Sequence, residues 1–377
     1  MKTKKAQIQL GFNWIYILIA GAVILLFFVG IVAKQKTSSE EKLSYDIVGV
    51  MDSIFTGASV AEKTKNFIDT SGLVDVEFYF SCKEGLGEFG ISGQSAAIQN
   101  AIDPLFSPST IQTAEVITWS LPYHLPFKVV DFLFVTSKNT KYYLIDDGGP
   151  FAFEFLNATD GINVESVNGI GDFKPGNNRE VRIIDLKNII SAGTSVPDSL
   201  KGLGDKVSVA QLTSDGSVIY YKKDSDDKWR EQGSAPIISV DGERDAAKYA
   251  ALFAADSEQY LCNMRKAMKR LTYVSEVYSG KVEDILAYYQ ENVVSVPDEI
   301  DRTVMANCLA KLEGSATSSP YYIDRAFNTY KQNVEFCRLA LSEGEPSQCS
   351  NLEEEAKKLF DLNNKESGLQ GCPVRFY

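Results

Sequence analysis

Residues 14–33 read WIYILIAGAVILLFFVGIVA, a run of 20 residues without a charged residue or a proline. A helix of this length spans roughly 30 Å, which is the thickness of the hydrocarbon core of a bilayer. A buried helix of a soluble protein is the alternative, but such helices rarely run this long without a polar residue. The sequence therefore predicts one transmembrane helix and a lipid bilayer as a partner of the chain.

The charges that flank this run predict its orientation. Three lysines precede it within a short N-terminus, whereas the two lysines that follow it are soon joined by Glu40 and Glu41. This basic bias favours a cytoplasmic N-terminus and an extracellular C-terminal body in a single-pass protein of the cell membrane. A cleaved secretory signal peptide is the alternative, but its apolar region would be shorter and would be followed by an A-x-A-like site.

The composition describes a folded, acidic body. Apolar residues make up 44% of the chain and aromatic residues 11%, so the body can bury a core. Residues 1–36 hold five lysines and no acidic residue, which leaves 33 basic against 50 acidic residues, a net charge of −17, for the rest. An acidic body argues against nucleic acid as a partner, since nucleic-acid binding needs a basic surface.

The cysteines indicate disulfides. Their even number and the extracellular topology make disulfides the default for Cys82, Cys262, Cys308, Cys337, Cys349 and Cys372. The expected pairs are Cys262–Cys308, Cys337–Cys349 and Cys82–Cys372, although six cysteines allow about 15 pairings. Because the chain has no C-x-x-C and only one histidine, no metal site and no cofactor is expected.

The N-terminal residues 1–13 read MKTKKAQIQLGFN. The basic residues Lys4 and Lys5, then Ala6 and Gln7, then the apolar run, resemble the class III signal peptide of archaeal type IV pilin-like proteins. The resemblance implies an archaeal origin, processing after Ala6 and a new N-terminus at Gln7. It covers only about the first 35 to 55 residues and implies nothing about the head.

This leader departs from the family at one point. Many members carry an acidic residue four or five positions into the mature chain, where this chain has Gly11 and Phe12. This departure argues against filament assembly more than it argues against membrane anchoring. A plain signal anchor that is not cleaved is the alternative interpretation.

The chain divides into five segments by pattern. They are a basic leader at 1–13, the transmembrane helix at 14–33, a helical stalk at 34–72, an α/β domain at 73–240 and a helical domain at 241–377. In the stalk, one helix is expected from about residue 12 to 56 and a second at 60–69. The first ends at Gly57 and has apolar residues at helical spacing, namely Leu43, Ile47, Val50, Met51 and Ile54.

The segment 73–240 alternates short β-branched and aromatic runs with turn residues, which predicts a mixed sheet. Hairpins are expected around residues 137–140 and at Asp215-Gly216. Short helices are expected at 94–102, 151–156 and 186–190, and a rigid turn at 121–126.

The segment 241–377 predicts a disulfide-stapled helical bundle. A periodic apolar pattern follows Asp241, a plausible N-cap, and runs to Tyr278. Further helices are expected at 282–292, 298–313, 321–341 and 352–362.

Two motifs point to sites, and each has a simpler alternative. Residues 85–90, GLGEFG, match the dinucleotide pattern G-x-G-x-x-G, but a glycine-rich turn is favoured because no acidic residue closes the following strand. Asp146 and Asp147 follow a strand end, where paired acids could hold a metal or act as acid and base. Ordinary turn chemistry is the favoured interpretation of this pair.

Four weaker features complete the survey. The acidic run 224–227 lacks the glycine and glutamate of a calcium loop, and His124, the one histidine, is expected to be structural. Asn157 begins a glycosylation sequon that fits an exported loop. Aromatic residues could form a binding face or a core, and these are Tyr288, Tyr289, Tyr321, Tyr322, Phe327 and Tyr330.

These patterns predict a membrane-anchored, extracellular structural or interaction protein of the cell surface, without catalysis. Its partners would be the bilayer and either further copies of itself, in a filament or oligomer, or other envelope proteins. The alternatives are a membrane-tethered enzyme that uses Asp146 and Asp147, and an exterior ligand-binding sensory domain.

Overall fold

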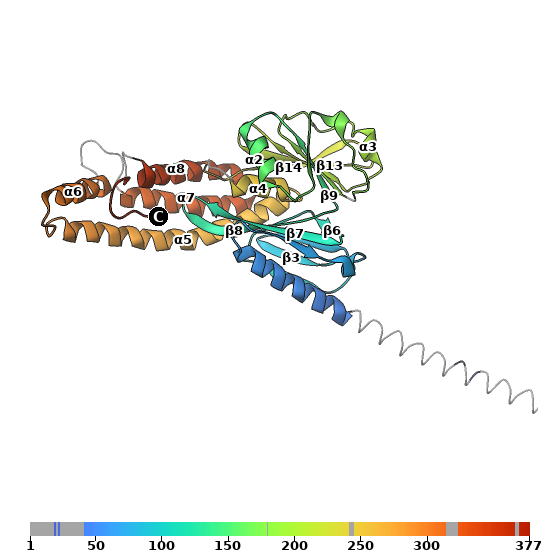
Figure 1. The fold of residues 1–377 in the computed structure, drawn as a ribbon, viewed down its shortest axis with the longest axis horizontal. Helices are drawn as coiled ribbons and strands as arrows, with labels where there is room; N and C mark the ends of the chain where they lie inside the picture. Colours follow the sequence, from blue (N-terminus) through green and yellow to red (C-terminus); the bar gives the residue numbers. More distant parts are fainter. Residues whose placement is uncertain are drawn as a thin grey trace, which may run out of the picture.

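The structure of the protein is a computed structural model that describes residues 19, 22, 41–178, 180–240, 245–313, 323–365 and 369–377. Figure 1 shows a lobe of small sheets with the helix of residues 41–60 lying against it. A second lobe contains the largest sheet, and a long arm of helices extends away from both lobes (Figure 1). The fold therefore combines α/β sheets with a C-terminal helical region.

The first lobe contains two four-stranded sheets. One has the order β1-β7-β8-β5, and the other has the order β4-β3-β2-β6. Their strands are β1 (Lys65–Asp69), β2 (Phe78–Lys83), β3 (Leu86–Ile91), β4 (Ala97–Asn100), β5 (Leu105–Phe106), β6 (Thr110–Ile111), β7 (Glu115–His124) and β8 (Lys128–Ser137). A short helix, η1 (Ser71–Leu73), follows β1.

The second lobe is built on a six-stranded mixed sheet with the order β10-β9-β11-β12-β13-β14. The first four strands run parallel, and the last two are antiparallel to their neighbours. The strands are β9 (Thr140–Ile145), β10 (Val164–Val167), β11 (Glu180–Asp185), β12 (Val207–Leu212), β13 (Ser217–Lys223) and β14 (Trp229–Pro236). The helices of this lobe are α2 (Pro150–Ala158), η2 (Ile170–Asp172) and α3 (Asp198–Lys201).

The six-stranded sheet is buried on both faces. Ile183 of β11 belongs to the apolar cluster that includes Leu200 of α3, whereas Ile184 belongs to the large cluster that includes Phe155 of α2. Because successive side chains of a strand point to opposite faces, a strand covered on both sides is apolar at nearly every position. This explains a run such as KYYLI at residues 141–145.

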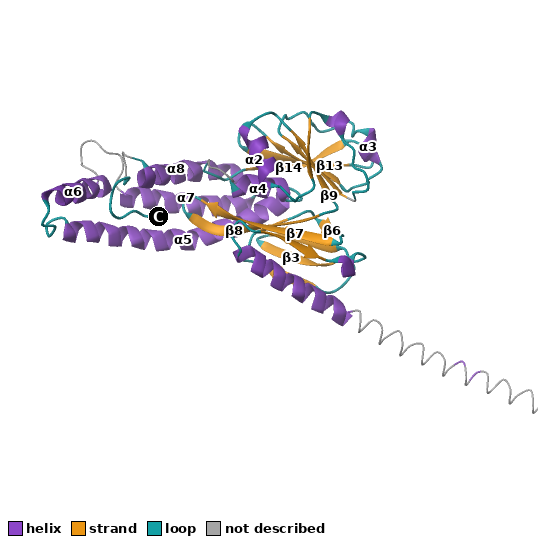
Figure 2. Ribbon diagram, in the orientation of Figure 1, coloured by secondary structure: helices purple, strands orange, loops and turns teal. Residues whose placement is uncertain are grey.

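The C-terminal region is helical (Figure 2). Its helices are α4 (Ala246–Phe253), α5 (Ser257–Asn292), α6 (Glu299–Glu313), α7 (Ile323–Glu343), η3 (Pro346–Cys349) and α8 (Ser350–Asn364). The helix α5 packs along α7 and also contacts β2, β8 and β14. It therefore joins the helical arm to both lobes.

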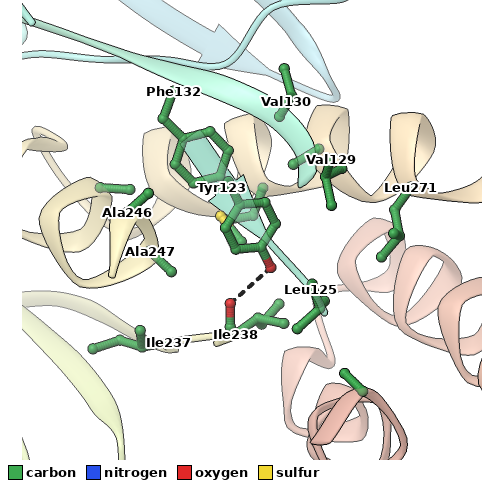
Figure 3. Packing of buried hydrophobic residues seen from close by; sticks show 14 of the residues in the cluster. Tyr123, Leu125, Val129, Val130, Phe132, Ile237, Ile238, Ala246, Ala247 and Leu271 are labelled. Atoms are coloured by element: carbon green, nitrogen blue, oxygen red, sulfur yellow. Dashed lines mark hydrogen bonds between the residues drawn. The ribbon is translucent and has the colours of Figure 1, made fainter. Parts of the chain in front are cut away.

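Tyr123 lies at the meeting point of these parts (Figure 3). Its ring stacks on Phe132 of β8 at a centroid distance of 4.6 Å, and its hydroxyl donates a hydrogen bond of 2.8 Å to the backbone oxygen of Ile238. The core around it contains Ala247 of α4 and Leu271 of α5. One continuous core thus links strands and helices that are more than 100 residues apart in sequence.

Several predicted elements are confirmed, among them the mixed sheet, which is the six-stranded one; the remaining described strands form two further sheets. The hairpin at Asp215-Gly216 is confirmed as β12–β13. The hairpin at 137–140 is wrong, since β8 pairs in one sheet and β9 in another. The segment 121–126 is mostly strand: β7 extends to His124, and a cis peptide bond precedes Pro126.

Three of the predicted short helices are wrong. Residues 65–69 form β1, and residues 97–100 form β4 beside β3, so edge pairing overrides local helix propensity. Residues 186–190 form a loop, because Asn188 has a positive φ of 57° and Asp185 accepts hydrogen bonds from the N–H groups of Lys187 and Ile190. The helix predicted at 151–156 is confirmed as α2.

The predicted helix boundaries also change. The first helix continues past Gly57 to residue 60. Residues 247–278 belong to two helices, α4 and α5, while α5 runs through Gly280 without a break. Asp245 is the N-cap of α4, and Asp241 lies outside the described residues.

The predicted transmembrane helix lies outside the described residues apart from Ile19 and Ala22. Among the residues that the structure describes, no helix combines the length and the apolar character required to cross a bilayer. The predicted processing positions Ala6 and Gln7 also fall outside the described part of the chain.

Candidate functional site

The helix of residues 41–60 is fixed to the first lobe through one face. Val48, Met51 and Phe55 are buried in a cluster with the strands of the β4-β3-β2-β6 sheet. The ring of Phe55 contacts those of Phe80 and Phe89 at centroid distances of 6.0 and 5.1 Å. This contact connects the N-terminal segment to the head.

The buried face of this helix differs in part from the predicted one. Met51 is buried, and Ile47 and Ile54 pack partly against the sheet. Leu43 and Val50, which the helical spacing assigned to the same face, are 59% and 60% exposed. The spacing located an apolar face, but only the docking of the helix on the sheet decided which side chains it covers.

All six cysteines form disulfides. The pairs are Cys82–Cys262, Cys308–Cys372 and Cys337–Cys349. The pairing expected for Cys337 and Cys349 is confirmed, and the other two expected pairs are wrong. The fold brings β2 against α5, which places Cys82 beside Cys262 rather than beside Cys372.

Asp146 and Asp147 lie at the carboxyl end of β9, where the chain turns toward α2. The neighbours of β9 are β10 and β11, so this end is a topological switch point of the kind at which open α/β sheets often bind ligands. Asp146 accepts a hydrogen bond from the N–H of Gly148 at 2.7 Å, and Asp147 accepts one from the N–H of Gly149 at 2.9 Å. The two carboxylates therefore cap a turn.

The surroundings of this turn offer little for catalysis or metal binding. Outside the turn, the carboxylate of Asp146 accepts a hydrogen bond of 3.4 Å from the hydroxyl of Ser166. Across the described ranges of the chain, no three His, Cys, Asp or Glu side chains are grouped as a metal site. The geometry favours turn chemistry for Asp146 and Asp147.

The G-x-G-x-x-G motif forms the β2–β3 hairpin. Glu84 and Gly85 make the turn with positive φ values of 52° and 82°, and the remaining glycines lie in β3. A Cβ at Gly87 would lie 2.4 Å from Nζ of Lys266, and one at Gly90 would lie 2.5 Å from the backbone oxygen of Ala96. These glycines make room for neighbouring groups, and no helix follows them at a distance suited to a phosphate.

The weaker candidates have structural roles. Burial lowers the pKa of His124, whose charged neighbours are Lys128, Glu62 and Lys63. Asp224 accepts hydrogen bonds from the N–H groups of Asp226 and Lys228 and so holds a turn. These features fit a structural histidine and a solvated acidic turn.

The sequon lies in the last turn of α2 rather than in a loop. Asn157 is exposed, but the hydroxyl of Thr159 is buried and donates a hydrogen bond of 2.6 Å to the backbone oxygen of Phe155. Asn157 lies in a helix, and the hydroxyl of Thr159 is already hydrogen-bonded. The sequon is therefore poorly placed to accept a glycan in the folded protein.

The predicted aromatic face is largely core. Tyr289, Phe327 and Tyr330 are buried, whereas Tyr288 is 43% exposed. Tyr321 and Tyr322 lie outside the described residues. The described members of this set therefore serve mainly to pack the helical arm.

A polar cavity that the sequence did not predict lies at the amino ends of β9, β11 and β12. Its volume is about 140 Å³, and the end of α4 closes one side of it. Tyr142, Arg182, Ser208 and Lys222 line it as one row across β9, β11, β12 and β13, since these residues are direct cross-strand partners. Glu180 and its cross-strand partner Thr140 form the next row toward the strand ends.

The two ends of this cavity carry opposite charges. Burial raises the pKa of Glu180 to about 7, although the positive charge of Lys206 and hydrogen bonds from Thr110 and Thr140 oppose the rise. Arg182 is 5% exposed and donates hydrogen bonds to the backbone oxygens of Leu252, Ala254 and Ala255 and to the hydroxyl of Ser208. The cavity thus combines a half-buried carboxyl group with a buried guanidinium group.

One sequence feature could have pointed to this cavity. In the strand EVRIID, charged residues alternate with apolar ones at Glu180 and Arg182, although the strand is otherwise typical of one buried on both faces. Charged residues rarely occur inside such a strand unless they have partners. The sequence alone could not tell which loops would meet over them.

Comparison of the chain with protein-family models, with curated proteins and with solved structures finds no match. The function has to be inferred from the sequence and from the geometry described above.

Proposed function

We propose that the protein is a single-pass, membrane-anchored protein of the cell surface whose body faces the exterior and has a structural or interaction role. The observation that carries this proposal is that all six cysteines are paired in the folded body. Disulfides persist in oxidising environments and are rare in the cytosol. Their presence agrees with the topology expected from the lysine bias around residues 14–33.

The docking of the first described helix supports the same proposal. The helix of residues 41–60 follows the apolar run after only a short polar segment, and it is held to the head by Val48, Met51 and Phe55. A helix that packs on the head so close in sequence to the predicted anchor suits a protein that presents its surface to other envelope proteins.

The leader supports a more specific version, in which the chain is processed after Ala6 and assembles with further copies of itself as archaeal pilin-like proteins do. This version rests on the resemblance at Lys4, Lys5, Ala6 and Gln7 and on the apolar run. A plain signal anchor without assembly is the competing version.

The experiment is intact mass measurement and N-terminal sequencing of the full-length protein from the membrane fraction, with and without reduction. A chain that begins at Gln7 would support pilin-like processing, and a chain that begins at Met1 would contradict it. A mass six hydrogens below the reduced value supports three disulfides and an exterior body. A fully reduced chain would contradict the topology.

Of the alternatives, a ligand-binding sensory domain is favoured by a specific observation, namely the charged cavity between Glu180 and Arg182. A tethered enzyme that uses Asp146 and Asp147 has less support, because both carboxylates are engaged by the turn that they cap.

A further inference from the structure

The charged groups of the cavity at the amino ends of β9, β11 and β12 do not neutralise each other. Glu180 and Arg182 lie two residues apart on the same face of β11, so their Cα atoms are separated by roughly 6.6 Å. No ion pair joins Glu180 and Arg182. Among the described carboxylates, none lies within ion-pair distance of Arg182, and Lys206 is paired with Glu77. Asp256 and Lys206 act on Arg182 and Glu180 from a distance, but neither forms a direct ion pair with them. Charges in a partly buried site that are not directly paired favour a ligand of complementary charge.

The acidic end suits an ammonium group. Glu180 accepts hydrogen bonds from the hydroxyls of Thr110 and Thr140 at 3.3 and 3.4 Å, and a carboxylate has room for further donors. The cation whose charge opposes the raised pKa of Glu180 is Lys206, and its Nζ lies 3.3 Å from Glu77, so Glu180 shares this cation with a second carboxylate. A second cation that reached Glu180 through the cavity would supply the missing counter-charge.

The basic end suits a carboxylate group. The hydrogen bonds of Arg182 occupy four of its five N–H groups, and their acceptors are three backbone oxygens and a hydroxyl, none of which is anionic. Lys222 lies in the same row and forms an ion pair of 3.4 Å with Asp256, whose negative charge also acts on Arg182. Two cations and one carboxylate leave this end of the cavity with a net positive charge. The remaining donors of Arg182 and Lys222, with the hydroxyl of Ser208, could hold a carboxylate between them.

We propose that this cavity binds a small α-amino acid in its zwitterionic form, with the ammonium group at Glu180 and the carboxylate group at Arg182, Ser208 and Lys222. The volume of about 140 Å³ is close to that of an engineered cavity of about 150 Å³ that holds benzene, a six-carbon ring. A ligand of the size of alanine therefore fits. This inference specifies the ligand-binding alternative and does not depend on the membrane anchor.

The test is isothermal titration calorimetry of the full-length protein in detergent at pH 8 with L-alanine, propionate and ethylamine. Propionate lacks the ammonium group of alanine, and ethylamine lacks its carboxylate group. The expected result is that alanine binds at least tenfold more tightly than either analogue. Equal binding of propionate or ethylamine would overturn the zwitterion assignment, and the absence of measurable binding by all three would mean that the cavity holds only water.

Two variants separate the ends of the cavity. Glu180→Gln keeps the size of the side chain and removes its charge, so alanine affinity should fall to that of propionate while propionate affinity stays unchanged. Lys222→Met should weaken the binding of both alanine and propionate. Glu231→Gln, an exposed glutamate of β14, is the matched control and should change neither.

Thermal unfolding of each variant shows whether it is folded. If folded Glu180→Gln protein binds alanine as tightly as the unmodified protein, the assignment is wrong. Failure of binding would leave the anchor proposal intact, because the anchor is tested by mass and N-terminal sequence.

Discussion

Cys82 of β2 is bonded to Cys262 of α5 across 180 residues of sequence. The bond ties the first lobe to the helix that also carries the helical arm, and the N–H of Gly85 donates to the Cys262 sulfur at 3.2 Å. It closes by far the longest loop of the three disulfides, since the other two span 64 and 12 residues.

This difference in loop length predicts unequal effects of removing the bonds. In the chain-entropy model, a disulfide that closes 180 residues stabilises the fold by about 5 kcal/mol, and one that closes 12 residues does so by about 3 kcal/mol. We expect Cys82→Ala/Cys262→Ala to lower the free energy of unfolding more than Cys337→Ala/Cys349→Ala does. Chemical unfolding of both double variants in detergent measures this difference, and an equal or reversed order would contradict it.

The helix of residues 41–60 should depend on Phe55 and not on Val50. Phe55 is buried among Phe80 and Phe89, so Phe55→Ala should destabilise the contact of helix and sheet by about 3–5 kcal/mol. Val50→Ala, at a position 60% exposed, should change stability by less than about 0.5 kcal/mol. Limited proteolysis between residues 61 and 64 reports detachment, and equal cleavage of both variants would rule out this docking role.

Glu180 should make the folded protein less stable as the pH rises from 5 to 8. Its pKa is about 7 in the folded state against an ordinary value of 4.5, so the folded state holds a proton that the unfolded state loses. Stability from this group is fully present below about pH 4.5 and is lost as the pH rises through about 7. At about 1.4 kcal/mol for each pKa unit, the loss is on the order of 3 kcal/mol.

Glu180→Gln should remove this part of the pH dependence. The difference in free energy of unfolding between the variant and the unmodified protein should therefore grow in favour of the variant between pH 5 and pH 8. Chemical unfolding at a series of pH values measures the difference, and Glu231→Gln is the control. A difference that does not change with pH would show that Glu180 titrates normally.

Gly87 and Lys266 should be energetically coupled. A Cβ at position 87 would lie 2.4 Å from Nζ of Lys266, and this side chain is only 4% exposed, so it has little room to move. We expect Gly87→Ala to cost about 1–3 kcal/mol of stability. Lys266→Met keeps most of the side chain but removes the ammonium group, so Gly87→Ala should cost less in that background.

Lys266→Met by itself tests a second expectation. Burial lowers the pKa of Lys266 to about 8, below its ordinary value of 10.5, so the folded state loses its proton first. Stability from this group therefore increases as the pH rises from about 8 to about 10.5. The unmodified protein should gain stability relative to Lys266→Met over this range. A difference in stability that stays constant with pH would contradict the lowered pKa of Lys266. Additive effects in the double variant would contradict the proposed contact between position 87 and Lys266.

The parts of the fold that could be predicted from the sequence are those stabilised by residues close together in the chain. The helix α2, the hairpin β12–β13 and the helices α6 and α8 each follow from local periodicity or a turn sequence. The disulfide Cys337–Cys349 belongs to the same group, because only 12 residues separate the two cysteines. The apolar run at 14–33 is a local feature as well, and it is the sole basis for the predicted anchor.

The remaining features depend on contacts between distant segments. Residues 97–100 are a strand because β3 offers them a partner, and β8 and β9 belong to different sheets despite the short turn between them. Local propensity is weaker than the hydrogen bonds and buried area that such pairing supplies. Cys82 meets Cys262, and not Cys372, for the same reason.

The polar cavity is the clearest example of a feature that depends on the tertiary structure. Thr110, Thr140, Glu180, Lys206 and Lys222 come from five separate segments, and only the sheet order places them around one space. The sequence by itself determined an acidic body with six cysteines behind an apolar run, because composition and local periodicity are properties of the chain. The tertiary structure alone decided which charges are buried together, since burial and counter-charges depend on neighbours that are remote in sequence.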